Sequence, residues 1–264
     1  AVDTHNAEAL ALLTRIVNIN SGTMNLAGVR RVADVLRPQL ESLGFTTHWA
    51  DGAPFKRAGH LIAEHTGPGP KILLIGHLDT VFEPSSPFQK FVRINDSTAT
   101  GPGVIDMKGG DVVMLFALRA LKDAGELEKM NVTAVFDGDE EDAGRPLALA
   151  RKALVDAAAG ASAAMGFEDG AGDPRSAVIS RRSATEWKLT TTGYPGHASQ
   201  IFHDDIGAGA IFEMSRILTE FYQKLSGEPY LAFSPGLALG GTLVHVDSTN
   251  TAGTCSTAAS FRPS

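Results

Sequence analysis

Hydrophobic residues along the first two thirds of the chain follow two patterns, one helical and one extended. From Ala7 to Ile19 and from Leu26 to Leu43 they recur at helical spacing, which predicts two amphipathic helices. Pro38 lies inside the second pattern, where it predicts a kink. The continuous apolar run Ile72–Ile75 is instead typical of a strand that is buried on both faces of a sheet.

The same criteria predict further strands and helices that alternate as far as residue 167. Short extended runs indicate strands at Phe45–Ala50, His60–His65, Asn131–Phe136 and Ala163–Phe167, the last of them buried. Helices are predicted at Val112–Ala124 and Pro146–Ala159. This alternation indicates an α/β fold with a mostly parallel sheet flanked by helices.

The pattern changes after the turn-forming segment at residues 170–174. We expect strands at Glu186–Thr192, Leu237–Val246 and Thr254–Arg262, and a helix at Ile206–Leu225. This order predicts two domains, residues 1–176 and 177–264, of which the second is a small α+β domain. That pattern requires another helix and strand beyond Ser264, so we expect the chain to be truncated within the second domain.

Composition narrows the class of protein. The chain has 264 residues, 43% of them hydrophobic, which is enough for a sizeable core. No apolar run approaches the roughly 20 residues that span a bilayer. The net charge of −7 argues against binding to nucleic acid. Cys255 is the one cysteine, so a disulfide framework is excluded and a thiolate metal site is disfavoured.

Two polar residues follow the buried run at once, His77 and Asp79. In an extended chain, positions i and i+2 point to the same side, so an imidazole and a carboxylate would lie together at the sheet edge where α/β folds bind ligands. The alternative is that the strand ends there and the aspartate caps the next turn.

Acidic residues also lie near the ends of other predicted strands and at a turn. Asp106 lies in a glycine-rich turn whose spacing does not match a phosphate-binding loop. Five of the six residues from Asp137 to Asp142 are acidic, and Glu168 follows the next strand. Taken alone, the segment 137–142 has a solvated acidic loop as its alternative interpretation. It lacks the spacing of a calcium-binding loop.

Together these side chains predict a site for divalent cations, because clustered carboxylates without a counter-ion are costly. One imidazole among several carboxylates suits zinc, with manganese or cobalt as alternatives. One ion would not offset this charge, so we expect two ions bridged by a shared aspartate. Such a pair activates water and polarises a carbonyl.

The motifs GHLDTVF, GPGVIDMKGG, GDEE and GHAS resemble the co-catalytic zinc family of glutamate carboxypeptidases, aminoacylases, acetylornithine deacetylases and succinyl-diaminopimelate desuccinylases. The intervals also suit this family, with 29 positions from His77 to Asp106 and 35 from Asp106 to Glu141. The glutamate carboxypeptidase branch is the most similar. The resemblance implies a catalytic domain with an inserted lid and dimerisation domain, and hence a homodimer.

The resemblance also implies roles for the polar residues of the first domain. His77 and Glu168 would hold one zinc ion, Glu141 would help to hold the other, and Asp106 would bridge them. Asp79 would orient His77.

Two further expectations follow from the same resemblance. Glu140 would be the general base that takes a proton from water and returns it to the leaving amine. The peptide bond Asp106–Met107 would be cis.

In the lid, His197 matches the histidine that reaches the partner subunit's site and stabilises the oxyanion. Without the resemblance, a histidine after Pro-Gly is more often an ordinary turn residue. Arg181 and Arg182 at the hinge are candidate ligands of a substrate carboxylate, although surface arginines are the alternative. His245 and Asn250 follow Gly240-Gly241-Thr242 and are held open as substrate-binding residues.

One family feature is missing. The family's last zinc ligand is a histidine near the C-terminus, whereas after Glu168 this chain has only His197, His203 and His245, all in the predicted lid. Two hypotheses remain. The first is a hydrolase that releases an amino acid from a small peptide or an N-acyl amino acid. The second is a catalytically impaired homologue that acts as a binding or scaffold protein. The start at Ala1 fits a processed or trimmed chain. Together with the resemblance to peptidases, it slightly favours a periplasmic or secreted location over a cytoplasmic one.

Overall fold

The computed structural model describes residues 2–170, 172–173, 175–180, 182–183, 185–246 and 253–256. The chain divides into two compact units, Ala1–Val178 and Ile179–Ser264, and each is described by itself. This division lies close to the boundary that we expect at residue 176.

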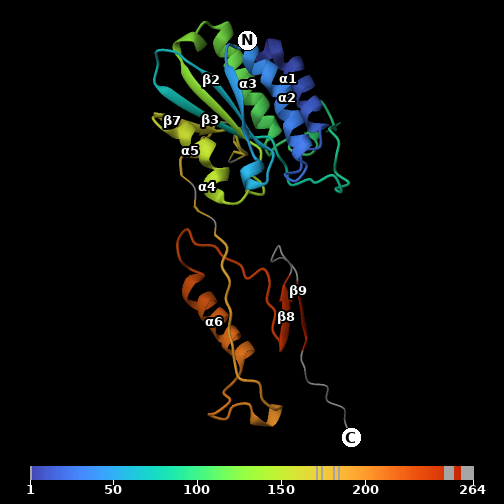
Figure 1. Cartoon of the computed structure of the whole chain (residues 1–264), viewed down its shortest axis with the longest axis vertical. Helices are drawn as coiled ribbons and strands as arrows, with labels where there is room; N and C mark the ends of the chain where they lie inside the picture. Colours follow the sequence, from blue (N-terminus) through green and yellow to red (C-terminus); the bar gives the residue numbers. More distant parts are fainter. Residues whose placement is uncertain are drawn as a thin grey trace. The chain divides into compact units, whose positions relative to one another are not determined.

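The first unit is built on a five-stranded sheet among the described residues, with the strand order β1-β2-β6-β3-β7 (Figure 1). The strands are β1 (Thr46–Asp51), β2 (Gly59–His65), β3 (Lys71–His77), β6 (Asn131–Asp137) and β7 (Ala163–Gly166). β3 pairs in parallel with β6 and β7, while β2 is antiparallel to both β1 and β6. All the strands except β2 therefore run in one direction, which confirms the expected mostly parallel sheet.

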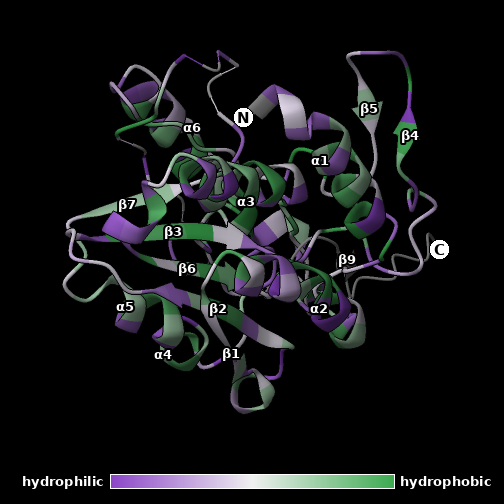
Figure 2. Cartoon of the chain, turned by 90° about the horizontal axis from the view of Figure 1, so that it is seen from above, coloured by the Kyte–Doolittle hydropathy of each residue, from purple (hydrophilic) through white to green (hydrophobic). Residues whose placement is uncertain are grey.

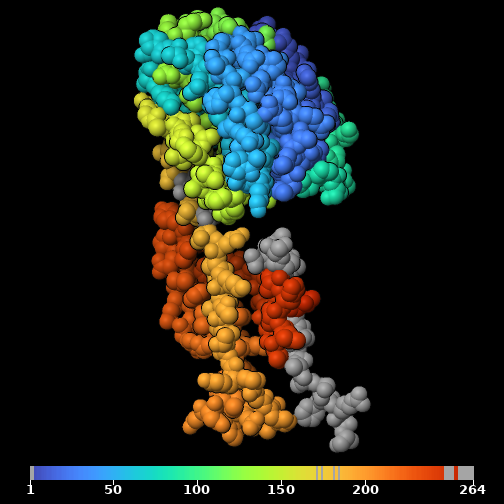
Figure 3. Space-filling model, viewed as in Figure 1, coloured from blue at the N-terminus to red at the C-terminus, as the bar shows by residue number. Residues whose placement is uncertain are grey.

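Helices cover both faces of this sheet. α1 (Val2–Val17), α2 (Leu26–Ser42) and α3 (Lys108–Asp123) lie on one face, and α4 (Leu147–Ala150) and α5 (Lys152–Ala158) lie on the other. In Figure 3 the blue residues of the first two helices form a large part of the near surface of this unit. Shorter elements connect these parts: the turns Ala53–Phe55 and Leu127–Lys129, and the hairpin of β4 (Val92–Arg93) and β5 (Ala99–Thr100).

Alternate residues of the central strands enter two different cores because successive side chains of a strand point to opposite faces. On β6, Val132, Ala134 and Phe136 belong to the larger core, and Val135 belongs to the smaller one. Figure 2 shows largely hydrophobic colouring on β3 and β6, as expected of strands with helices on both faces. The run Ile72–Ile75, of which Leu73 and Leu74 are buried, thus forms an interior strand of the sheet.

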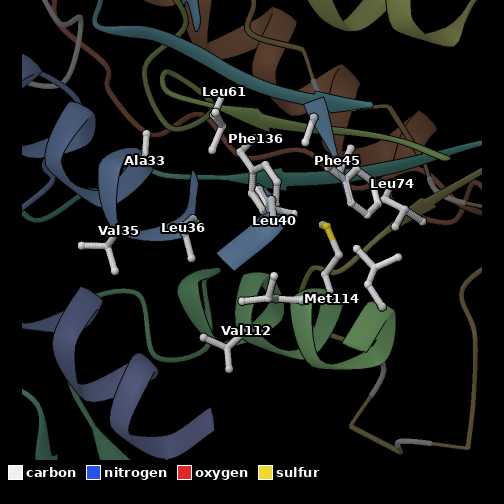
Figure 4. Close-up of a cluster of buried hydrophobic side chains, with 14 of the residues drawn as sticks. Ala33, Val35, Leu36, Leu40, Phe45, Leu61, Leu74, Val112, Met114 and Phe136 are labelled. Carbon is white, nitrogen blue, oxygen red and sulfur yellow. The ribbon is translucent and has the colours of Figure 1, made fainter. Parts of the chain in front are cut away.

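The larger core lies between the sheet and the three helices of the first face. Leu36 and Leu40 of α2 are buried there, as their helical spacing predicts. Figure 4 shows both residues with Leu61 and Phe136 from the sheet and Met114 from α3. Pro38 lies inside α2, and the helix continues to Ser42.

Three expectations for the first unit need correction. The predicted helix Pro146–Ala159 is divided into α4 and α5, because Arg151 leaves helical geometry with φ −94° and ψ 0°. The strand β7 is exposed at all its residues, because it is an edge strand that pairs with β3 alone among the described residues. The predicted helix Val112–Ala124 begins earlier, at Lys108.

The second unit contains the short turn Ala198–Gln200, the helix α6 (Ala210–Leu225) and the antiparallel pair β8 (Leu243–Val246) and β9 (Gly253–Ser256). The segment Glu186–Thr192 is not a strand, because no described segment pairs with it. The helix starts later than expected, since Gly207 and Gly209 have positive φ values. The predicted strand Leu237–Val246 shortens to β8, and the last part of Thr254–Arg262 lies outside the described residues.

Candidate metal centre

Four predicted site residues of the first unit lie at or beyond the carboxyl ends of three neighbouring parallel strands, and Asp106 lies in the turn before α3. His77 is the last residue of β3, Glu140 and Glu141 follow β6, and Glu168 follows β7. Parallel strands bring their carboxyl ends to one edge of a sheet, so residues far apart in sequence meet there.

Three side chains form a compact set of metal-ligand atoms. Nε2 of His77 lies 2.9 Å from Oδ1 of Asp106 and 3.6 Å from Oε1 of Glu168. The ligand atoms of the three residues all lie within 4.8 Å of one another. The imidazole is buried, whereas both carboxylates are partly open to solvent. One nitrogen and two carboxylate oxygens suit a zinc or manganese ion, so these residues fit a divalent metal.

The peptide bond between Asp106 and Met107 is cis, as the family resemblance implies. Met107 is buried, while the preceding carboxylate is exposed. The helix α3 begins directly afterwards, at Lys108. The predicted bridging aspartate thus directly precedes a buried residue, while its own carboxylate belongs to the ligand set.

Asp79 is fully buried and contacts four partners. Its Oδ1 lies 3.3 Å from Nδ1 of His77 and accepts the backbone N–H of Glu140 at 3.1 Å. Its Oδ2 accepts the hydroxyl of Thr23 at 2.6 Å and the backbone N–H of Glu141 at 3.2 Å. Nδ1 of the histidine also lies 3.1 Å from the backbone carbonyl oxygen of Asp79. The carboxylate thus contacts the predicted metal ligand and also the loop after β6.

These contacts shift the protonation of both groups. Burial opposes a charge on His77, but the hydrogen bond and charge of Asp79, together with Asp111 and Glu168, raise its pKa to about 10. Burial would raise the pKa of Asp79, yet the hydrogen bonds from His77 and Thr23 hold it below its usual value. In metal-free protein the pair is therefore an imidazolium and a carboxylate.

Glu140 and Glu141 differ in their surroundings. The first is exposed and the second is half-buried. Burial raises the pKa of Glu141 to about 7, and the charge of Asp106 adds to this shift, although His77 opposes it. The backbone N–H groups of both glutamates are held by Asp79, which gives their side chains a common rigid support.

The acidic loop Asp137–Asp142 is neither a solvated loop nor a single anionic cluster. Asp137 and Asp139 are buried and face basic groups on the far side of the loop. These contacts are His60 Nδ1 to Asp137 Oδ1 at 3.0 Å, Arg151 Nη1 to Asp139 Oδ1 at 2.6 Å, and Arg57 Nη2 to Asp142 Oδ2 at 2.8 Å. Glu140 and Glu141 instead donate their backbone N–H groups to Asp79, the partner of His77.

Sequence reasoning missed several residues of this region. His60, Arg57, Arg151 and Thr23 lie in ordinary segments, and no motif marks them as partners of the acidic residues. A further case is Lys108, which is fully buried and donates to the carbonyl oxygens of Ile16 and Ile19. Such partners become visible only when the chain is folded, because their separation in sequence is large.

The structure describes three of the five predicted site residues of the second unit, namely Arg182, His197 and His245. Nδ1 of His197 lies 2.9 Å from the hydroxyl of Ser199, at the start of a short helical turn. Arg182 is exposed, and His245 is exposed in β8. Arg181 and Asn250 lie outside the described residues. In the part of the chain that the structure describes, no helix is both long and apolar enough to cross a bilayer.

With this geometry established, comparison with known proteins gives the family. The model for peptidase family M20/M25/M40 matches residues 73–234, which include the whole candidate metal centre. The chain therefore belongs to this peptidase family, and the family resemblance inferred from the motifs is confirmed.

Among curated relatives, carboxypeptidase G2 of Pseudomonas sp. (strain RS-16) is 27% identical over 89% of this chain and 55% of its own length. Aminoacylase-1A of Rattus norvegicus is 29% identical over 74% of this chain and 50% of its own length. The chain thus spans about half the length of these two relatives.

Solved structures share the fold. A dipeptidase from Saccharomyces cerevisiae, Dug1p, matches with a TM-score of 0.52 and 20% identity, over 62% of this chain and 39% of that one. Human carnosine dipeptidase 1 matches with a TM-score of 0.52 and 18% identity, over 73% of this chain and 41% of that one. At this level of identity the comparison supports the α/β fold alone.

Proposed function

We propose that this chain carries the metal site of a hydrolase that cleaves a peptide or amide bond and releases an amino acid. The observation that carries the proposal is the ligand set of His77, Asp106 and Glu168, with the loop of Glu140 joined to it through Asp79. The relatives named carboxypeptidase and aminoacylase support this class of substrate, namely small peptides and N-acyl amino acids.

The residues of the chain have separate tasks in this proposal. His77, Asp106 and Glu168 would hold one ion, and Glu141 with a shared Asp106 would hold a second, with zinc as the preferred metal. When bound, divalent ions supply Lewis acidity toward the scissile carbonyl and make water more acidic. Glu140, exposed at the edge of the site, would accept a proton from the attacking water and pass it to the leaving amine.

The second unit would complete the reaction in a homodimer. His197 would donate a hydrogen bond to the developing oxyanion in the partner subunit's site, a role supported by its GHAS motif. Arg182, Arg181, His245 and Asn250 are candidates for binding the substrate carboxylate. Ala substitutions at these positions should raise KM more than they lower kcat.

Glu140→Gln tests the central role, measured in the full gene product with a panel of dipeptides and N-acyl amino acids. Loss of a general base should lower kcat about 10²- to 10⁴-fold. The metal content, measured by mass spectrometry, should stay unchanged. Glu126→Gln is the matched control, because Glu126 is exposed and, in the part of the chain that the structure describes, forms an ion pair with Lys129.

Full turnover in Glu140→Gln would contradict the role given to Glu140. The metal content of the unsubstituted protein is a second test of the hydrolase proposal, which expects two ions per chain. A protein that binds one ion or none and turns over none of these compounds would support the binding or scaffold hypothesis instead.

A further inference from the structure

The acidic loop Asp137–Asp142 is held on two sides, and only one of them belongs to the metal centre. On the metal side, Asp79 accepts the backbone N–H groups of Glu140 and Glu141. On the opposite side the loop buries Asp137 and Asp139. Residues of both sides follow one another directly in this loop. Contacts that hold the buried Asp137 and Asp139 therefore also fix the backbone position of Glu140 and Glu141.

Arg151 makes the principal contact on the buried side. Its Nη1 donates to Oδ1 of Asp139 at 2.6 Å, and its Nη2 donates to the backbone carbonyl oxygen of the same residue at 3.1 Å. The second carboxylate oxygen of Asp139 accepts the backbone N–H of Gly144 at 2.8 Å. The guanidinium therefore fixes both the side chain and the backbone of the residue directly before Glu140.

The buried residues His60, Asp137 and Asp139 have the side-chain types of a metal site, but the guanidinium of Arg151 already lies beside them. Ligand atoms of His60, Asp137 and Asp139 lie within 4.8 Å of one another. The guanidinium of Arg151 lies against Asp139 and 4.0 Å from Asp137, so it supplies the positive charge that the buried carboxylates need. The ring of Phe55 stacks on His60 at a centroid distance of 5.2 Å and closes the group on that side.

Arg151 lies at an irregularity of the fold. The predicted helix 146–159 is interrupted at this residue, which ends α4 and precedes α5. The side chain is 24% exposed, whereas Asp139 is fully buried. A break in the helix here coincides with the contact of its side chain with the acidic loop.

We propose that Arg151 is a positioning residue for catalysis. Through Asp139 it holds the acidic loop in the geometry that keeps the N–H groups of Glu140 and Glu141 on Asp79, and hence keeps the Glu140 carboxylate at the metal centre. The catalytic part of this inference rests on the proposed function, because it assumes that Glu140 is the general base. The structural part, the coupling of Arg151 to the two amides, does not.

Amide hydrogen exchange tests the structural part without any turnover. In metal-free protein, Arg151→Gln should speed exchange of the Glu140 and Glu141 amides at least tenfold, because the loop loses one of its two supports. Arg151→Lys should restore part of the protection, since a lysine keeps the charge but not the two-point contact. Lys152→Gln is the matched control, because Lys152 is adjacent to Arg151, is exposed and, among the described residues, forms its ion pair with Asp156.

Kinetics test the catalytic part in the full gene product. Arg151→Gln should lower kcat at least tenfold, change KM less than twofold and leave the metal content unchanged, with Lys152→Gln at the unsubstituted rate. Asp139→Asn should produce the same pattern, and it serves as the second variant if Arg151→Gln does not fold. Its amide keeps the shape of the carboxylate and loses the charge.

The possible outcomes separate the two proposals. Unchanged exchange of both amides in Arg151→Gln and in Asp139→Asn would overturn the inference. Faster exchange with an unchanged kcat, while Glu140→Gln is inactive, would overturn its catalytic part. If Glu140→Gln itself is fully active, the proposed function fails, and faster exchange would still support the coupling of Arg151 to the loop.

Discussion

Oδ1 of Asp79 accepts the backbone N–H of Glu140 at 3.1 Å, which joins the end of β3 to the loop after β6. The same oxygen lies 3.3 Å from Nδ1 of His77. One buried carboxylate therefore orients a predicted metal ligand and positions the predicted general base. A change at this residue should affect both.

Asp79→Asn should lower the pKa of His77 from about 10, because the imidazolium loses its nearest negative charge. The amide cannot accept hydrogen bonds at both positions, so we also expect a loss of about 1–3 kcal/mol in the free energy of unfolding. NMR titration of the metal-free protein and urea denaturation measure the two effects. Asp96→Asn is the control, since Asp96 is fully exposed. An unchanged pKa of His77 would refute the orienting contact.

Metal uptake should depend on pH with a defined sign. The pKa of His77 in metal-free protein is about 10, so the ring carries a proton at neutral pH that an incoming ion must displace. Affinity for zinc should therefore rise about tenfold per pH unit up to pH 10. Below about pH 7 the raised pKa of Glu141 adds a second proton and a steeper dependence. Calorimetry in buffers of different ionisation enthalpy measures the number of protons released when zinc binds. Zinc binding at pH 8 without proton release would contradict this prediction.

Gly110→Ala should disturb the ligand set through the backbone before Glu168. A methyl group at Gly110 would lie 1.9 Å from the carbonyl oxygen of Phe167, which is too close for any contact. The segment must move, so we expect weaker zinc binding and a destabilisation of about 1–3 kcal/mol. Gly166→Ala in β7 is the matched control, because nothing lies within 4 Å of the added atom. Equal zinc affinity in the two variants would show that this close approach is not needed.

The two faces of α3 should respond differently to truncation. Leu118 is 2% exposed in the larger core, so Leu118→Ala should cost about 2–5 kcal/mol in the free energy of unfolding. Val113 on the same helix is 60% exposed, and Val113→Ala should change the free energy of unfolding by less than about 0.5 kcal/mol. Urea denaturation of both variants compares them directly. A similar cost at the two positions would contradict the assigned face of the helix.

Much of the first unit was predictable from local patterns. The run Ile72–Ile75 becomes a central strand because only a doubly covered strand buries such a run, and the apolar positions of α2 match the face it buries. His77 and Asp79 were predictable as partners because they lie two positions apart at a strand end, while the metal-ligand assignments beyond them came from the family motifs.

Other features were not predictable, because they depend on neighbours rather than on local pattern. The composition of Ala163–Phe167 resembles a buried strand, yet β7 is exposed because it lies at the sheet edge. The segment 146–159 has a continuous helical pattern, and its break at Arg151 accompanies a contact with Asp139, twelve positions earlier. The segment Glu186–Thr192 alternates like a strand but has no described strand to pair with.

The sequence by itself determined the α/β order of the first unit, the strand ends that carry His77, Glu140 and Glu168, and the family to which the chain belongs. Only the tertiary structure decided how the five charges of the acidic loop are divided. The carboxylate of Asp139 contacts Arg151, while the backbone N–H of Glu140 donates to Asp79. The physical reason is that a buried carboxylate requires a counter-charge, and the counter-charges here come from segments that are near in space and far apart in sequence.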